Sequence, residues 1–338
     1  MTGSDRPRID ALMTGYQDSA ILLTAGALGV LAALGDPQRP GHPGPGRTAV
    51  ELARARQLDP RALEVLLLAL VPAGVLERGD DGRFRLREDV APLVLPDGEG
   101  SMAAILEHNF HLMKRWAHLD SVVRTGEPVP REEGKRPPEE LRAFILGMKD
   151  ISIRSSAEVA DVVDLSGGLR LLDVGGGPGT ASITFARRFP DLHCVVFDLP
   201  EVVPIARDEI AAAGLEHRID VVAGDFHTDR LGHGFDVVYL SNIIHSLSPA
   251  ETGKLFAHAA HALNDGGRIV VKDFFLDDSR TEPAQAARFA VNMLVGTREG
   301  KSYTWTETRM VLEAVGFGDL AEHRVARASG LLVGRKTG

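Results

Sequence analysis

Two hydrophobic patterns divide the chain. From Leu169 onward, short apolar runs alternate with amphipathic segments, a pattern typical of a parallel sheet with crossover helices. It predicts five successive strands, at 169–174, 193–198, 219–225, 235–242 and 267–275. Helices are predicted between them at 178–188, 201–213 and 249–263, and a last helix at 306–315 precedes two further strands near 321–327 and 331–334. The C-terminal half is therefore predicted to be a doubly wound α/β domain, whose ligands bind at the carboxyl ends of its strands.

The first hundred residues have a mostly helical pattern instead. Residues 11–34 are apolar on more than one face, which predicts a helix that is largely buried, in part against another subunit. After a Pro/Gly-rich loop at 35–47, two short helices follow, the first capped by Thr48 and the second opened by Asp59. A hairpin turning at 81–82 comes next. Helix, helix and hairpin in this order predict a winged-helix arrangement.

A winged helix either binds DNA or serves as a packing and dimerisation module. Residues 47–88 carry eight arginines against seven Asp and Glu residues, a net charge of +1. Phosphate contacts need a much more basic surface than this. The charge therefore favours the packing and dimerisation interpretation.

A helical region connects the two halves of the chain. Helices are predicted at 108–128 and 139–164, and the charged, proline-bearing stretch 131–140 is predicted to be a surface loop. The predicted domains are therefore a dimerisation domain at 1–100, a helical linker at 101–165 and the α/β domain at 166–338.

Composition adds limits on partners and location. The 338 residues are 44% hydrophobic and 25% charged, as in a globular protein, and their formal charge of −9 argues against binding a nucleic acid. A single cysteine, Cys194, cannot form an internal disulfide and fits a reducing compartment. No cationic leader and no apolar stretch of about 18 residues is found, so we expect no membrane span and a cytoplasmic location.

The sequence LLDVGGGPGT (171–180) places three glycines directly after the first predicted strand. Gly175 and Gly177 superficially suit a dinucleotide fingerprint, but the last glycine of that fingerprint would fall at Thr180. Asp173 also precedes the glycines, and a carboxylate there repels a pyrophosphate. A cofactor that carries an amino group would gain from it.

Two more acids end the next two predicted strands. Asp198 can accept hydrogen bonds from both hydroxyls of a ribose. Asp225 can accept from an adenine amino group while the ring of Phe226 covers the base. Three acids on three consecutive strands predict a cationic nucleoside without phosphates, and S-adenosylmethionine fits all three positions.

These residues resemble a known family. The segments DVGGGPG, FDLP and GDF, with the histidine of SNIIHSLSPAE, are similar to class I methyltransferases, and more narrowly to small-molecule O-methyltransferases typified by caffeic acid and hydroxyindole enzymes and their bacterial natural-product relatives. The resemblance implies a Rossmann-like sheet, a homodimer formed through the N-terminal winged-helix domain, and S-adenosylmethionine converted to S-adenosylhomocysteine. The implied cofactor-binding residues are Asp173, Gly175, Gly177, Asp198, Leu199, Asp225, Phe226, Ser241 and Asn242.

The resemblance also implies a catalytic base. His245 follows the fourth predicted strand, and an imidazole can take the proton of an acceptor hydroxyl near neutral pH. Asp273, at the end of the fifth strand, matches a family acid that orients this histidine. Ser246 and Ser302 stand where the family has further acids, so methylation of carbon or nitrogen stays open beside O-methylation. His108, His111 and His118 lie on a predicted helix without a clear carboxylate partner, so no metal is expected.

We expect a small aromatic acceptor in an apolar pocket between the helical region and the sheet. The candidate lining residues are Phe110, Met113, Trp116, Met148, Asn292, Met293 and Tyr303. Asn292 is the polar member of an otherwise apolar helix, so it could hydrogen-bond an acceptor substituent. Two other classes remain as alternatives, a winged-helix transcription regulator that senses a ligand and an NAD(P)-dependent oxidoreductase.

Overall fold

The structure is a computed structural model of the chain and describes residues 6–130, 138–325 and 329–337. It comprises two compact units. Unit 1 contains residues 1–114 and 137–150, and unit 2 contains residues 115–136 and 151–338. The predicted helical linker, 101–165, is thus shared between the two units. No helix in the described ranges is long and apolar enough to cross a membrane.

Unit 1 is mostly helical, as predicted. Its elements are α1 (Arg6–Ala27), α2 (Val30–Ala33), α3 (Ala49–Arg56), α4 (Pro60–Leu70), β1 (Leu76–Arg78), β2 (Phe84–Leu86), α5 (Ala91–Val94), most of α6 (Ala103–Trp116) and the start of α8 (Pro138–Val162). The prediction of one helix over 11–34 is wrong, because the chain turns at Gly29 with a φ of 66°. Arg56 stabilises this break by donating to the carbonyl of Leu28 at 2.9 Å.

The predicted order of helix, helix and hairpin is present. Thr48 and Glu51 form a capping box at the start of α3, and Asp59 accepts the N–H of Ala62 at 2.7 Å at the start of α4. β1 and β2 pair antiparallel around the predicted turn. Both helices therefore begin where local capping chemistry places them.

The connecting helices differ from the prediction at one point. The helix predicted at 108–128 is two helices, α6 and α7 (Leu119–Thr125), which are separated at 117–118. Most of the predicted loop at 131–140 lies outside the described residues, and α8 begins at Pro138.

Unit 2 contains a seven-stranded sheet. Its strands are β3 (Arg170–Val174), β4 (His193–Asp198), β5 (Ile219–Ala223), β6 (Phe235–Ser241), β7 (Leu263–Asp273), β8 (Phe317–Val325) and β9 (Ser329–Lys336). The order is β5-β4-β3-β6-β7-β9-β8, in which β3 to β7 are parallel and β9 is antiparallel to both neighbours. The doubly wound prediction is confirmed, and β9 enters between β7 and β8.

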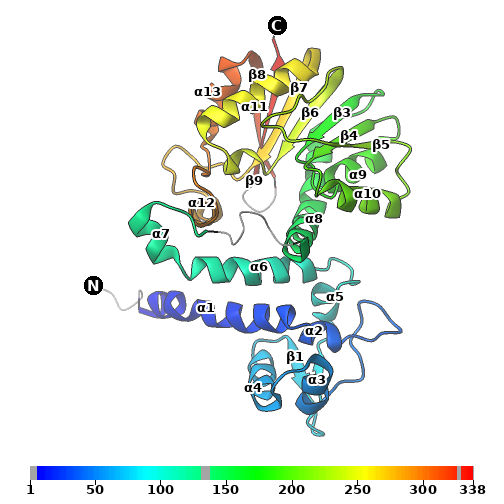
Figure 1. Cartoon of the computed structure of the whole chain (residues 1–338), viewed down its shortest axis with the longest axis vertical. Helices are drawn as coiled ribbons and strands as arrows, with labels where there is room; N and C mark the ends of the chain where they lie inside the picture. The colour runs from blue at the N-terminus through cyan, green and yellow to red at the C-terminus, as the bar shows by residue number, and fades with distance from the viewer. Residues whose placement is uncertain (1–5, 131–137, 326–328, 338) are drawn as a thin grey trace. The chain divides into compact units, whose positions relative to one another are not determined.

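Helices cover both faces of the sheet (Figure 1). One face packs against α11 (Pro249–Ala262) and α13 (Trp305–Ala314), with Phe256 fully buried. The other packs against α9 (Thr180–Arg188), α10 (Val203–Ala212) and the C-terminal half of α8, with Phe185 fully buried. Buried apolar side chains therefore fill both faces, and polar side chains gather at the strand ends.

Candidate active site

Three carboxylates lie at one edge of the sheet. Asp173 is next to last in β3, Asp198 ends β4, and Asp225 follows β5 by two residues. β4 lies between β5 and β3 in parallel register, so these ends are neighbours. Within the described residues, none of the three pairs with a Lys, Arg or His side chain within 4.0 Å. The edge therefore presents uncompensated acceptors, which suit a ligand that is cationic or rich in donors and not a pyrophosphate.

The glycine turn between β3 and α9 brings backbone to this edge. Gly177 has a φ of 57°, and a Cβ added to it would have no atom within 4 Å, so its surface is open. Its N–H donates to Asp198 Oδ2 at 2.7 Å. Gly175 has a φ of 64°, and a Cβ there would lie 2.4 Å from Ile243 Cδ1. The first glycine is thus needed for packing, whereas the second leaves room for a ligand against the backbone.

Asp198 and Asp173 are held in different ways. Asp198 also accepts the N–H of Leu199 at 2.7 Å, and burial raises the pKa of its carboxyl while these two backbone hydrogen bonds oppose the rise. Asp173 is 1% exposed and accepts the Ser182 hydroxyl at 2.7 Å. Burial raises the pKa of Asp173 to about 6, and the charge of Asp198 adds to the rise. A cationic group at this place would favour the ionised form of Asp173.

Asp225 and Phe226 complete the edge on the β5 side. Both are half-buried, and Asp225 Oδ1 accepts the N–H of His227 at 2.9 Å. The ring of Phe226 packs against the core below and lies 4.5 Å from the ring of His227. A carboxylate beside an aromatic face is an arrangement that can bind a heterocycle with an amino group.

His245 and Asp273 come together on the other side of β3. His245 lies in η1 (Ile244–Ser246) after β6, and Asp273 ends β7. Asp273 Oδ1 lies 2.7 Å from His245 Nδ1, and Asp273 Oδ2 accepts the backbone N–H of His245 at 3.3 Å. The N–H of Phe274 also donates to Asp273 Oδ1, at 2.8 Å. With Nδ1 donating to the carboxylate, Nε2 is the nitrogen left to accept a proton.

Sequence reasoning missed an aromatic contact on the imidazole. Phe289 in α12 (Ala284–Gly296) meets His245 edge to face at a centroid distance of 4.7 Å, and it lies 4.3 Å from Phe274. Phe289 precedes Asn292 by three residues and so lies on the same helix face. The three-residue spacing from Asn292 could have indicated this contact in the sequence, but an aromatic residue on an apolar helix is more often part of the core.

The segment before α13 also contacts the backbone of His245. The N–H of Lys301 donates to the carbonyl of His245 at 2.8 Å. Ser302, where the family has an acid, is buried and donates to the carbonyl of Ala286 at 3.0 Å. Ser246 turns back to the carbonyl of Ile243. Asp273 is therefore the acid that contacts His245 in the part of the chain that the structure describes.

The predicted acceptor residues fall into both units. Trp116 Nε1 donates to Asn292 Oδ1 at 3.1 Å, so the amide nitrogen of Asn292 stays available as a donor. Met293 is buried. Tyr303 is buried as well, with its hydroxyl shared between the Leu247 carbonyl at 2.8 Å and Thr252 at 3.0 Å. The three candidates that lie in unit 1 are half-buried, namely Phe110, Met113 and Met148.

Ser241 and Asn242 follow β6 directly. Both are half-buried, and Asn242 has a left-handed φ of 58°. Its N–H donates to the carbonyl of Lys272 at 2.9 Å. Asparagine tolerates this conformation better than most residues, so the turn that leads to His245 is built without glycine.

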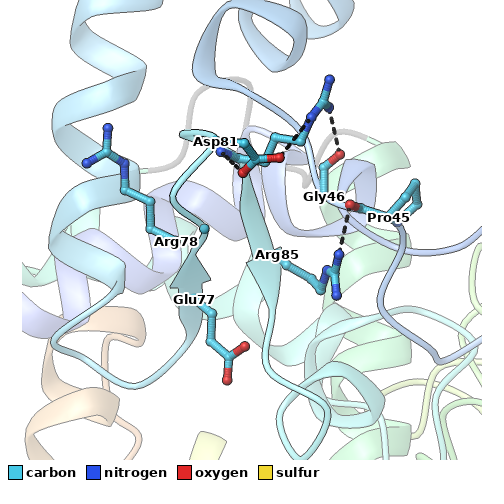
Figure 2. A pocket seen from close by; sticks show the side chains of 8 residues that line it. Pro45, Gly46, Glu77, Arg78, Asp81 and Arg85 are labelled. Carbon is cyan, nitrogen blue, oxygen red and sulfur yellow. Dashed lines mark hydrogen bonds and ion pairs between the residues drawn. The ribbon is translucent and has the colours of Figure 1, made fainter.

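A separate pocket of about 200 Å³ lies in unit 1, beside the hairpin (Figure 2). Two of its three arginines are engaged in polar contacts, and the third, Arg78, lies over the Phe84 ring at 5.8 Å from its centroid. Arg83 forms an ion pair with Glu51 at 2.8 Å and donates to the carbonyl of Gly46, and Arg85 donates to the carbonyl of Pro45. These contacts hold the hairpin to the rest of unit 1, which is a structural role. Within the described residues, no cluster of three or more His, Cys, Asp or Glu side chains could hold a metal ion.

Comparisons with known proteins agree with this chemistry. The family model described as an O-methyltransferase domain matches residues 122–318. The 3-hydroxy-5-methyl-1-naphthoate 3-O-methyltransferase of Streptomyces sahachiroi is 34% identical, over 96% of this chain and 94% of its own length. The L-tyrosine C(3)-methyltransferase of Streptomyces lavendulae is 28% identical, over 83% of this chain and 80% of its own.

A solved structure is similar to this chain along its whole length. Human N-acetylserotonin methyltransferase, in complex with S-adenosylmethionine, has a TM-score of 0.85 and 25% sequence identity, and the match covers 100% of both chains.

Protonation of Asp173 should control binding at this edge. With a pKa of about 6, Asp173 is ionised above that pH and neutral below it, so we expect the affinity for S-adenosylhomocysteine, which carries an ammonium group, to fall as the pH drops from about 7 to 5. Calorimetric titration across this range measures it. Asp173→Asn should bind more weakly at pH 7 and show a flatter profile. An unchanged profile in this variant would assign the effect to another group.

Proposed function

The chain belongs to the O-methyltransferase family, whose members use S-adenosylmethionine, and from this premise we propose that it methylates a hydroxyl of a small aromatic or polyketide-like metabolite with His245 as the general base. One observation carries the proposal: the 2.7 Å contact between His245 Nδ1 and Asp273 Oδ1. The naphthoate methyltransferase relative, which by its name acts on an aromatic hydroxyl, supports the acceptor class.

His245 moves the proton in this mechanism. Asp273 fixes the imidazole with Nε2 free, and Nε2 takes the proton of the acceptor hydroxyl as the oxygen becomes nucleophilic. S-adenosylmethionine, when bound, supplies a methyl group already activated on a sulfonium. The chain then has to hold the acceptor oxygen in line with that methyl and exclude water. His245 is 13% exposed and Asp273 is 3% exposed, which keeps their contact away from solvent.

The three carboxylates would hold the cofactor. We assign Asp198 to the ribose hydroxyls, because its two oxygens are already oriented by Gly177 and Leu199 at the end of β4. Asp225 and Phe226 take the adenine, and Asp173 takes the amino group. The remaining cofactor-binding candidates lie beside these carboxylates, namely Gly175 through its backbone and Ser241 and Asn242 through their polar side chains.

Asn292 and Phe289 are the acceptor-facing residues that the contacts favour. Trp116 occupies the amide oxygen of Asn292, so Asn292 would donate to an oxygen of the acceptor. Phe289 lies against His245 and offers an aromatic surface next to the base. Phe110, Met113, Met148 and Met293 stay predictions as further lining residues, as does Tyr303, whose hydroxyl is already bonded.

A carbon acceptor is the second candidate. The L-tyrosine C(3)-methyltransferase is 28% identical to this chain, and Ser246 and Ser302 stand where the family has acids near the proposed base. Isolating the product and locating the new methyl group by NMR decides between the two. A methyl on oxygen supports the first proposal, and a methyl on an aromatic carbon supports the second.

We also propose a homodimer formed through unit 1. The side chains of Ile9, Leu12, Met13 and Tyr16 on α1 are all more than half exposed. Their spacing of i, i+3, i+4 and i+7 places them in one apolar stripe on the helix. Such a stripe is stable in water when another surface covers it. A second copy of α1 is the occupant that the family resemblance implies.

Removing the base should abolish turnover without preventing cofactor binding. We expect His245→Ala to lower kcat by about 10²–10⁴-fold, because proton removal is lost, with cofactor affinity changed less than about twofold. Asp273→Asn should cost about 10–100-fold, since an amide nitrogen would face the N–H groups that the carboxylate now accepts. Steady-state kinetics and calorimetry measure both effects.

His258→Ala provides the control, because His258 is an exposed histidine on α11. It should leave kcat unchanged. If His245→Ala keeps wild-type turnover, His245 is not the base.

Charge on the α1 stripe should dissociate the dimer. We expect Leu12→Asp with Met13→Asp to shift the mass in light scattering from about twice 36.3 kDa to one chain, because two carboxylates cannot be buried in an apolar contact. Thr14→Asp lies on the opposite side of α1 and should stay dimeric. A wild-type protein that elutes as a monomer would refute the proposed interface.

A further inference from the structure

Lys272 is a buried cation with no carboxylate partner among the described residues. It is the next-to-last residue of β7 and only 2% exposed. Its Nζ donates to Asn242 Oδ1 at 3.3 Å, and in the described ranges no carboxylate oxygen lies within 4.0 Å of it. An ammonium group has three donors, and burying it beside one amide oxygen is unfavourable. The position therefore suits an anion that arrives with a ligand.

The ammonium form persists in this place. Burial lowers the pKa of Lys272 to about 8, and the charges of Asp273 and Glu158 oppose the decrease. Glu158 itself accepts from Arg154 at 3.1 Å. Lys272 is therefore mostly protonated at neutral pH, although neither acid contacts it within ion-pair distance.

The sheet register relates Lys272 to Asp173. Lys272 pairs with Ser241 of β6, and Tyr239, two residues before Ser241 and on the same face, pairs with Asp173 of β3. Because β6 is the one strand between β3 and β7, the acid and the lysine lie on the same face of the sheet, about 10 Å apart across the strands and about 7 Å apart along them, which places their Cα atoms about 12 Å apart. Ser241 and the turn at Asn242 lie between them.

This spacing fits an amino acid. An α-amino acid carries an ammonium and a carboxylate on one carbon, about 3 Å apart, and a contact of about 3 Å at each end gives a span of about 9 Å between the protein charges. The flexible four-carbon side chain of Lys272 can bridge the difference between this span and the separation of the two Cα atoms. We propose that Lys272 binds the carboxylate of the amino-acid part of the cofactor, opposite the ammonium that Asp173 receives. This inference rests on the cofactor position given under Proposed function.

A structural role for Lys272 is the competing explanation. Lys272 contacts Asn242 through its ammonium and through its carbonyl, so it could serve to hold the turn that leads to His245. The two roles differ in what they do to ligands. A carboxylate contact matters for S-adenosylhomocysteine and not for 5′-methylthioadenosine, which has the same nucleoside and thioether but no amino-acid part.

The test compares these two ligands by calorimetry at pH 7. We expect Lys272→Met to weaken S-adenosylhomocysteine binding by about 10–100-fold and 5′-methylthioadenosine binding by less than about threefold. Lys272→Arg keeps the cation and should recover part of the loss. Lys254→Met removes an exposed lysine from α11 and should change neither affinity.

Each other outcome has a definite meaning. Equal losses for both ligands, or a lower kcat with both affinities unchanged, would assign Lys272 to the turn and overturn the inference. If Lys272→Met does not fold, the ratio of the two affinities in Lys272→Arg and Lys272→Gln decides, and an unchanged ratio in Lys272→Gln overturns it. A wild-type protein that binds neither ligand would instead contradict the proposed cofactor site.

Discussion

Burial of the central sheet on both faces is the constraint on which the rest of this molecule depends. Once helices cover both faces with apolar side chains, a strand can place a polar group with access to a ligand only near its end. Parallel pairing from β3 to β7 then brings five carboxyl ends to one edge. The three carboxylates at the ends of β3, β4 and β5 and the pair of His245 and Asp273 both result from this arrangement. Chemistry and core packing are therefore specified by the same strands.

Much of the fold could be predicted because its signals are local. Each strand of the parallel sheet is a short apolar run, and the capping residues Thr48 and Asp59 mark helix starts at the positions that the structure shows. The breaks within the long helical segments could not be predicted in this way. A glycine within a helix costs only about 1 kcal/mol, which is too little by itself to end the helix at Gly29. The break there depends on Arg56, which lies 27 residues later in the chain and stabilises the turn. The insertion of β9 beside β7 likewise depends on contacts distant in sequence.

The candidate site also contains residues that local sequence patterns predict and residues that only tertiary contacts bring into place. Residues at strand ends were found from the sequence, because a polar residue after an apolar run is visible without knowing the fold. His245 and Asp273 are separated by 28 residues, and the structure brings them within 2.7 Å of each other. The contact of Phe289 with His245 and the burial of Lys272 were not predicted. Phe289 looks like an ordinary core residue of an apolar helix, and Lys272 like a lysine at the exposed end of a strand. Their surroundings, set by tertiary packing, distinguish them.

The hydrogen bond from the Lys301 N–H to the carbonyl of His245 links the proposed base to the chain that follows α12. The ring of Phe289 on α12 contacts the imidazole, and the chain that follows α12 holds the main chain of the same residue. A substrate that displaces α12 would therefore also misalign the base. Acceptors of the wrong size would be discriminated by slow turnover once bound, and not by weak binding alone. Broadening the acceptor range by mutation would then require changes that enlarge the space at Phe289 while leaving the 299–303 backbone in place.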